Sequence, residues 1–340
     1  MSSPKALPQG AAATPPELGD FTTDKRVLLL MGMAVLVGIF GMASAWVLIK
    51  LIALCTDIAY YGRFSFEHLP ISGTPFGWYV VFVPVIGCLI IGLMARYGSE
   101  KIRGHGIPEA MEAILIGKSR ISPKVAVLKP LSSAISIGSG GPFGAEGPII
   151  MTGGAIGSLL AQYVKLTSAE RKTLLVAGAA AGMTAVFGTP VAALMLAVEL
   201  LLFEWRPRSM LPVAVAGAVA AFLRGTYRGT GPLFPVETAP VTLHALISCI
   251  LAGLLCGVLA RTLSMALYKV EDRFEHLGVH WMWWPAIGGV VVGIGGYFQP
   301  RALGVGYDVI GDLLHNHLAL GVVLAILVVK AIIWVVALGS

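Results

Sequence analysis

The chain has 340 residues, of which 56% are hydrophobic and 12% are charged, and its mean hydropathy is +0.83. No ordinary soluble core needs so many apolar residues, so the composition excludes a typical soluble domain and indicates a membrane protein. The net charge of +6 does not indicate a nucleic-acid partner, because the Lys and Arg residues stand in small groups between apolar segments, as in membrane loops.

The N-terminal segment, residues 1–24, is polar and rich in Pro and Ala, and it lacks the apolar stretch of a signal peptide. We predict a mobile polar tail there. The first apolar segment follows Lys25 and Arg26 directly. This charge pattern favours a cytoplasmic N-terminus and a location in the plasma membrane, or in the inner membrane of a bacterium.

Long uncharged segments are the main secondary-structure signal, because roughly 20 apolar residues cross a lipid bilayer as a helix. Three segments qualify as membrane spans, namely Val27–Ile49, Thr173–Val198 and Thr238–Ala260. The shorter run Ser209–Leu223 is open between a tilted span, an interfacial helix and a half-helix that enters and turns back. We therefore predict an all-α polytopic membrane protein.

The chain contains an internal repeat. The stretch PVIGCLIIG at Pro84–Gly92 matches PAIGGVVVG at Pro285–Gly293 with an offset of 201 residues. Two further landmarks keep this offset, namely Lys129 with Lys330 and Gly138-Ser139 with Gly339-Ser340. A constant offset over distant landmarks favours true repetition over chance similarity, and repeated halves are common in transporters.

We predict a first membrane repeat over residues 25–225 and a second over residues 226–340. The counterpart of residues 140–148 would fall beyond Ser340, so the second repeat is expected to be incomplete and the chain to be a truncated product.

Glu146 is the only charged side chain between Lys129 and Lys165, and a charge at membrane depth usually marks an ion or proton pathway. It lies in GPFGAEGP, one of three motifs with Gly or Pro at the expected start of an apolar helix. These motifs are GHGIPEA at Gly104–Ala110, GPFGAEGP at Gly141–Pro148 and FGTPVAA at Phe187–Ala193. The free N–H groups of such helix starts attract anions. A carboxylate that merely caps a helix would also suit this position.

Two of these motifs resemble a known family. GHGIPE is similar to the GSGIP motif, and GAEGP to the GREGP motif, of the CLC chloride channels and proton-coupled chloride exchangers; residues 172–199 are also similar to a segment of that family. The resemblance runs from about Lys25 to the end of the chain. It implies a voltage-gated type of chloride transport without a cofactor, in a homodimer whose two independent pores each consist of inverted repeats with tilted and re-entrant helices.

The resemblance also assigns roles to residues. Glu146 matches the gating glutamate, whose carboxylate competes with the anion. The expected anion path comprises His105, Gly106, Ile107, Pro108, Gly144, Ala145, Gly147 and Pro148. His105 replaces the family's serine, and an imidazole there would make anion affinity depend on pH near neutrality. Ala145 replaces the usual arginine and removes a positive charge from the outer mouth.

The family's exchangers carry an inner proton-transfer glutamate at the position of Leu200. Glu199 or Glu204 would be the candidates for an inner proton route, but ordinary helix-end charges explain both. We therefore expect gated passive conduction of chloride, with proton-coupled chloride antiport as the alternative.

Two alternatives from other classes remain. A membrane enzyme with Glu146 as acid or base would lack a partner acid, a nucleophile and spaced metal ligands. A fragment that dimerises without transporting ions is also considered, because missing helices would expose apolar surface. Neither His315-Asn316-His317 nor the unpaired cysteines predict a metal site. These cysteines are Cys55, Cys88, Cys249 and Cys256.

Overall fold

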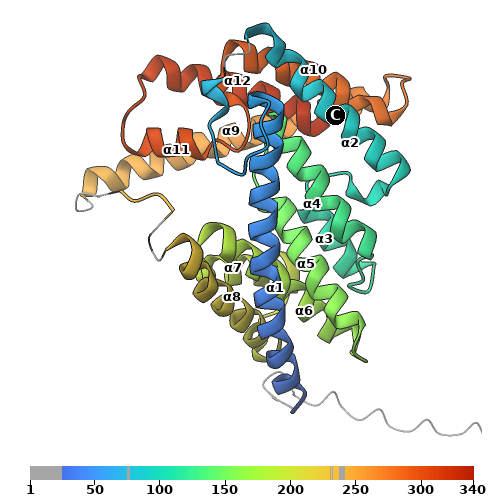
Figure 1. Ribbon diagram of the computed structural model, residues 1–340. Helices are drawn as coiled ribbons and strands as arrows, with labels where there is room; N and C mark the ends of the chain where they lie inside the picture. The colour runs from blue at the N-terminus through green and yellow to red at the C-terminus, as the bar shows by residue number, and fades with distance from the viewer. Residues whose placement is uncertain (1–24, 75–76, 230, 232, 237–241) are drawn as a thin grey trace, which may run out of the picture.

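The computed structural model describes residues 25–74, 77–229, 231, 233–236 and 242–340, so the predicted tail at 1–24 lies outside the described residues. Over the described part the chain is helical without strands, which confirms the all-α prediction (Figure 1). The α-helices are α1 Lys25–Thr56, α2 Phe82–Tyr97, α3 Ile107–Leu115, α4 Pro123–Gly138, α5 Glu146–Gln162, α6 Ser168–Phe187, α7 Pro190–Ala197, α8 Pro207–Arg228, α9 Leu243–Glu275, α10 Trp284–Phe298, α11 Tyr307–Leu314 and α12 Leu320–Gly339. Five helical segments of the described residues are long and apolar enough to cross a membrane, which agrees with a multi-pass protein.

The first half of the chain forms a bundle around α6. Helix α1 runs the length of the molecule in Figure 1 and packs against α4, α5, α6 and α8. Every residue of α6 from Thr173 to Val186 is buried. Helices α5 and α6 approach closely, because a Cβ atom on Gly153, Gly157 or Gly178 would collide with the backbone of the other helix. Small residues at such crossings are the usual means of tight packing between membrane helices.

The predicted single span Thr173–Val198 is wrong. The structure divides it between α6 and α7, and the break falls at Gly188-Thr189, inside the FGTPVAA motif. Gly188 ends α6 with a φ of 71°, which favours glycine, and Pro190 begins α7 with a φ already suited to the first turn. The ambiguous run Ser209–Leu223 lies within α8, one of the helices long enough to span a membrane.

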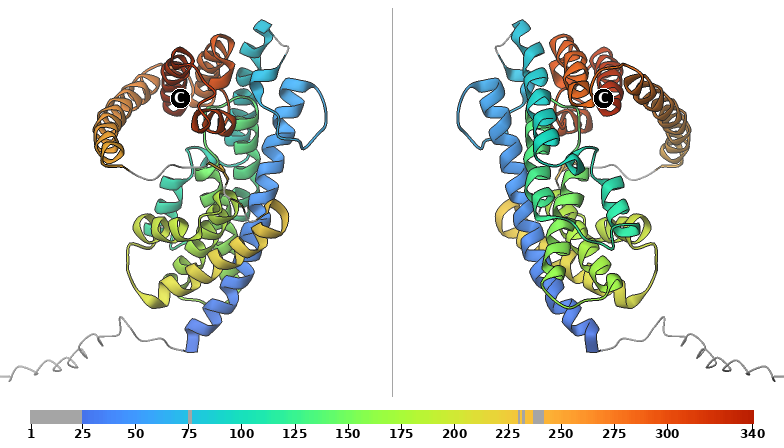
Figure 2. Two further views of the ribbon diagram at one scale, coloured as in Figure 1. Left: turned by 90° about the vertical axis from the view of Figure 1, so that its left-hand side faces the viewer. Right: turned by 90° about the vertical axis from the view of Figure 1, so that its right-hand side faces the viewer.

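The second half packs differently from the first. Helix α10 lies against α2 and α12, whereas α9 contacts mainly α12 and stands apart from the other helices in Figures 1 and 2. The predicted span Thr238–Ala260 lies partly outside the described residues, since 238–241 are not described. Helix α9 begins at Leu243 and continues beyond the prediction to Glu275. The prediction stopped at the first charged residue, Arg261, which ends an uncharged run but does not end a helix.

Elements of the two halves follow one another in the same order. Helices α2, α3 and α4 correspond to α10, α11 and α12 along the chain. One close contact recurs with the offset of 201 residues: a Cβ on Gly87 would collide with Ser139 Oγ, and a Cβ on Gly288 would collide with Ser340 Oγ. The repeated geometry agrees with the sequence repeat, while the boundary between residues 225 and 226 stays a prediction.

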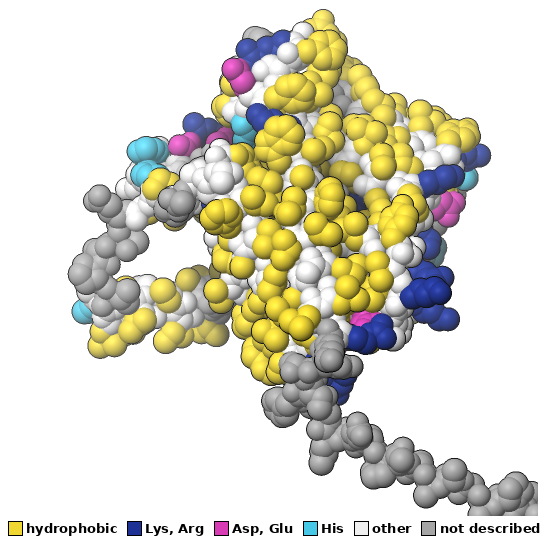
Figure 3. Space-filling view, turned by 60° about the horizontal axis from the view of Figure 1, so that its bottom comes forward, with side chains coloured by type: hydrophobic (Ala, Val, Ile, Leu, Met, Phe, Trp, Pro, Cys, Tyr) yellow, Lys and Arg dark blue, Asp and Glu magenta, His cyan; other side chains and the backbone are white. Residues whose placement is uncertain are grey.

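Hydrophobic side chains cover much of the face drawn in Figure 3, and Lys and Arg gather toward its edges. Large exposed apolar residues occur on α1, α2, α9 and α12. A surface of this kind is stable in lipid rather than in water, because burying it in hydrocarbon removes apolar area from water.

Candidate anion site

The N-termini of α3 and α5 meet in close contact. A Cβ atom on Gly106 would collide with the carbonyl of Gly147, and a Cβ atom on Gly147 would collide with the carbonyl of His105. Gly106 also has a φ of 108°, which side chains disfavour. Two motifs that are about 40 residues apart in sequence therefore touch through their glycines, and no other residue type fits at the contact.

Glu146 is the first residue of α5 and is half-buried. Its carboxylate is folded back over Gly144, since a Cβ on Gly144 would collide with Glu146 Oε2. The first amides of a helix have no intrahelical acceptor and carry a partial positive charge. The site thus combines a carboxylate, the room in which it lies and N–H donors that stabilise a negative charge.

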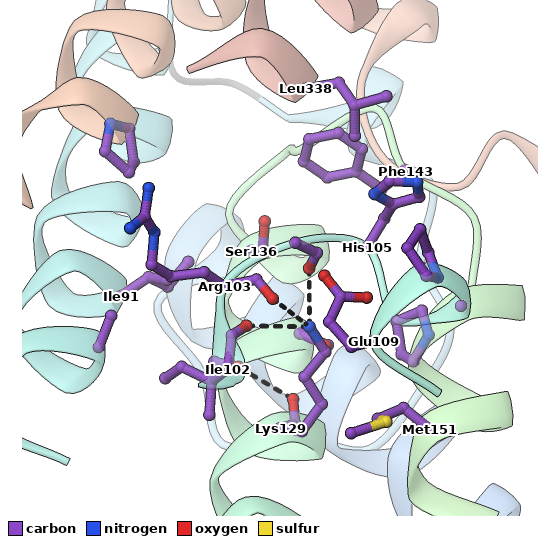
Figure 4. A pocket seen from close by; sticks show the side chains of 18 of the residues that line it. Ile91, Ile102, Arg103, His105, Glu109, Lys129, Ser136, Phe143, Met151 and Leu338 are labelled. Atoms are coloured by element: carbon purple, nitrogen blue, oxygen red, sulfur yellow. Dashed lines mark hydrogen bonds between the residues drawn. The ribbon is translucent and has the colours of Figure 1, made fainter. Parts of the chain in front are cut away.

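A cavity of about 1270 Å³ joins these features. Its lining includes the predicted gate, Glu146, and most of the predicted anion path, namely His105, Ile107, Pro108, Gly144, Gly147 and Pro148. Residues of the second half, among them Trp281 and Leu338, complete the lining, and Figure 4 shows part of this wall. The two halves therefore share one cavity.

Two predicted path residues do not line this cavity. Gly106 is buried at the contact with Gly147, where its part is to let the two helices meet. Ala145 is also buried and lines a separate small cavity together with His68 and Tyr307.

Glu109 is an acidic residue in the first turn of α3. Its Oε2 accepts a hydrogen bond of 2.7 Å from the N–H of Gly106. The Glu109 carboxylate therefore binds the N–H of Gly106, the residue directly after His105. His105 itself is exposed to the cavity. Capping of this kind holds the helix start in one conformation.

Several residues of the wall were not predicted from the sequence, above all Lys129. Lys129 was only a landmark of the repeat, whereas its side chain lines the cavity and is 2% exposed. A lysine inside an apolar helix was the available signal. The lining residues Arg103, Ser136 and Phe143 carried no comparable signal in the sequence.

The candidates for an inner proton route lie elsewhere. Neither Glu199 nor Glu204 is among the residues that line the cavity, and Glu199 is exposed on the turn after α7. Glu204 accepts a 2.6 Å hydrogen bond from Ser209 and lies 3.4 Å from Lys172 Nζ. Burial alone would raise the pKa of Glu204, but the Ser209 hydrogen bond and the charge of Lys172 outweigh it and lower the pKa.

Comparison with known proteins identifies the family. The sequence profile described as "Voltage gated chloride channel" matches residues 86–340. The chain belongs to the CLC family. Members of this family are channels and transporters, so a membrane enzyme is no longer an alternative.

Curated CLC relatives are distant in sequence. A putative chloride channel protein ClcB-like from Ralstonia nicotianae is 26% identical over 289 residues, which cover 83% of this chain and 67% of the relative. The H(+)/Cl(-) exchange transporter ClcA from Klebsiella pneumoniae is 26% identical, with 77% of this chain and 58% of the transporter covered. The chain therefore spans about three fifths to two thirds of the length of these relatives.

Solved CLC structures share the fold. A slow cyanobacterial Cl⁻/H⁺ antiporter has a TM-score of 0.77 at 20% identity, covering 94% of this chain and 75% of the antiporter. A CLC-type fluoride/proton antiporter has a TM-score of 0.75 at 20% identity, covering 94% of this chain and 77% of that protein. These similarities establish the CLC-type helical fold for the described residues.

Proposed function

We propose that the chain forms an anion pathway for chloride across a membrane, in which the anion passes through the cavity beside the N-termini of α3 and α5. The contact between Gly106 and Gly147 carries this proposal, because it brings two helix starts to one cavity. Converging N–H groups stabilise a negative charge without a full positive charge that would hold the anion too tightly to release it.

Glu146 is the gate in this proposal. Its deprotonated carboxylate is an anion at the start of α5, so it competes with chloride for the same N–H donors. Protonation removes that competition, and displacement by chloride does the same. The space over Gly144, where the carboxylate lies, gives the side chain a position of its own beside the path.

Passive gated conduction is the mode that the chain's own residues favour. Leu200 stands where family exchangers carry an inner proton-transfer glutamate. The Glu204 carboxylate already accepts a hydrogen bond from Ser209 and pairs with Lys172. Proton-coupled antiport is the second candidate, because relatives that match this chain carry the names of exchange transporters and antiporters. In that case protons would be a second transported ion.

His105 makes the anion affinity depend on pH in this proposal. Its side chain is exposed to the cavity, and an imidazolium ion attracts an anion more strongly than a neutral ring does. Anion binding that is flat between about pH 5 and 8 would contradict this role.

The membrane arrangement is proposed on similar grounds. Lys25 and Arg26 are the first two residues of α1 and precede its apolar run, which favours a cytoplasmic N-terminus in the plasma membrane or a bacterial inner membrane. Assembly as a homodimer and gating by voltage follow from the family resemblance and belong to the same proposal.

Chloride efflux from liposomes tests the function. The purified protein is reconstituted with and without a pH gradient, and wild type is compared with Glu146→Ala. We expect wild-type flux to depend on pH. The Glu146→Ala flux should be at least as large and should lose the part of the pH dependence that the carboxylate contributes, because no carboxylate competes with the anion, while the part due to His105 remains. Asp57→Asn is a matched control, since Asp57 is a buried carboxylate that does not line the cavity.

Three outcomes separate the candidates. Flux without proton movement supports the channel. Chloride-driven proton uptake establishes exchange despite Leu200. A well-folded protein that moves no anion defeats the transport proposal and leaves the non-transporting fragment.

A further inference from the structure

The ammonium group of Lys129 donates hydrogen bonds to three backbone carbonyls. Lys129 Nζ donates to the carbonyl oxygens of Ile102 at 2.9 Å, Arg103 at 3.3 Å and Gly104 at 2.7 Å (Figure 4). A lysine ammonium has three N–H donors, and here each has an acceptor. Although Lys129 lines the cavity, it therefore has no donor left with which to bind an anion.

These bonds set the direction of the neighbouring amides. Across a trans peptide, the carbonyl of one residue and the N–H of the next point in opposite directions. When the carbonyls of Arg103 and Gly104 point at Lys129, the N–H groups of Gly104 and His105 point away from it. Within the described part of the chain, no hydrogen bond uses either of these two N–H groups.

Glu109 fixes the other side of His105. Its carboxylate accepts from the N–H of Gly106, and Figure 4 shows Glu109 in the same wall as Lys129. Gly104 and Gly106 have φ values of 77° and 108°. His105 thus sits between two glycines in left-handed conformations, one held by a buried ammonium and the other by a carboxylate.

We propose that Lys129 is a positioning residue, which orients the free N–H groups of Gly104 and His105 toward the anion and thereby sets selectivity among anions. The inference rests on the proposed anion path and goes beyond it. It assigns selectivity to the backbone on either side of His105, and the control of that backbone to a side chain that does not touch the ion.

The second half repeats part of the arrangement, with one lysine–carbonyl bond instead of three and a different central side chain. Lys330, the counterpart of Lys129, donates to the carbonyl of Gly304 at 3.1 Å. Val305 stands between Gly304 and Gly306, where the first half has His105. The lysine and the glycines recur in both halves, whereas the central side chain does not. This pattern indicates that the lysine orients the backbone and does not act on the central side chain.

A purely electrostatic role for Lys129 is the competing explanation, and the two differ in a measurable way. Coulomb attraction depends on the charge of the anion, so its loss would weaken the binding of all monovalent anions by the same factor. The direction and spacing of N–H donors match some anion sizes and shapes better than others. Their disturbance would therefore change the ratios between anions.

The test is the affinity of detergent-solubilised protein for chloride, bromide and nitrate, measured by titration calorimetry for wild type and Lys129→Met. We expect the chloride affinity to fall at least about tenfold, equivalent to about 1.4 kcal/mol. The nitrate-to-chloride affinity ratio should shift at least about fivefold, because a planar and a spherical anion need different donor positions. A uniform loss for all three anions, or no loss, overturns the proposal.

Lys129→Arg keeps the charge but presents donors in a planar fork that does not match three converging carbonyls. Positioning predicts a changed nitrate-to-chloride ratio in this variant as well, whereas a purely electrostatic role predicts the wild-type ratio. Lys129→Arg also serves if Lys129→Met fails to give monodisperse protein.

Lys172→Met is the matched control. Lys172 also donates to a backbone carbonyl, that of Leu202 at 3.0 Å, but it does not line the cavity. We expect wild-type anion ratios for this variant. Absence of anion binding and flux in wild type would defeat the proposed function itself, whereas normal wild-type binding with unchanged ratios in both Lys129 variants would defeat only the role of Lys129.

Discussion

Gly106 has a φ of 108°, and the place of its missing Cβ is taken by the carbonyl of Gly147. Both observations predict that Gly106→Ala damages the protein. The strained backbone alone costs about 1 to 3 kcal/mol, and the collision must move either α3 or α5. We expect a lower melting temperature in detergent and the loss of measurable chloride binding.

Gly257→Ala in α9 is the control for this substitution, because nothing lies within 4 Å of its missing Cβ. Alanine in the interior of a helix is favoured over glycine by roughly 0.5 to 1 kcal/mol. Unchanged or slightly higher melting is therefore expected for Gly257→Ala. Wild-type melting and binding in Gly106→Ala would show that the two helix starts do not need their close contact.

At the residue scale, the sequence identified the side chains of the site better than the groups that hold them. Glu146 was found because it is a lone charge among apolar residues, and the structure places it in the cavity wall. The part of Lys129 was not predicted, because it depends on three carbonyls 25 to 27 residues away in sequence. Sequence patterns contain no information on where backbone carbonyls point.

At the scale of the single element, helix α6 begins with a capping box. Thr167 Oγ1 accepts from the N–H of Glu170, and the Glu170 carboxylate accepts from the N–H of Thr167 at 2.8 Å. Arg26 of α1 pairs with the same carboxylate at 2.7 Å. Burial alone would raise the pKa of Glu170, but the Thr167 hydrogen bonds and Arg26 outweigh it and lower the pKa.

A lowered folded-state pKa means that this stabilisation is present above the unfolded pKa and is lost as the pH falls through the folded value. We predict that Glu170→Gln lowers the free energy of unfolding by about 1 kcal/mol at pH 7, since the half-exposed Arg26 limits the strength of the ion pair. The difference from wild type should shrink toward zero as the pH falls well below about 4.3, the ordinary value for Glu.

Melting temperatures in detergent at several pH values measure this effect. Glu67→Gln is the control, because the Arg63–Glu67 ion pair is largely exposed and is expected to contribute little. A Glu170→Gln deficit that is as large at acid pH as at pH 7 would contradict the electrostatic explanation.

Element boundaries were the least predictable part of the fold. The run Thr173–Val198 is uniformly apolar, and hydropathy alone joins α6 to α7 across Gly188. The FGTPVAA motif in the same run did predict a helix start there, and the structure confirms that start at Pro190. Local turn chemistry was therefore the better guide than the length of the apolar run.

At the scale of the whole molecule, the two halves meet where α2 packs against α10. A Cβ on Gly293 would collide with the backbone of Val81, and one on Gly289 would lie 3.1 Å from that of Pro84. We predict that Gly293→Val forces the halves apart and lowers the melting temperature strongly, because backbone cannot move aside as a flexible side chain can.

Gly253→Val is the matched control on α9, where nothing lies within 4 Å of the missing Cβ. It should leave melting and the elution volume in size-exclusion chromatography nearly unchanged. Equal tolerance of both substitutions would show that the contact between α2 and α10 contributes little to holding the halves together.

The seam between α2 and α10 also bears on the origin of the chain. The two helices carry matching sequences 201 residues apart, and each packs a glycine against the serine that directly follows α4 or α12, Gly87 on Ser139 and Gly288 on Ser340. Contact between equivalent surfaces is the pattern of an isologous dimer. A half-length ancestor would thus have met a second copy of itself through the surface that now joins the halves. Fusion of two such genes would make that contact intramolecular and would allow His105 and Val305 to differ.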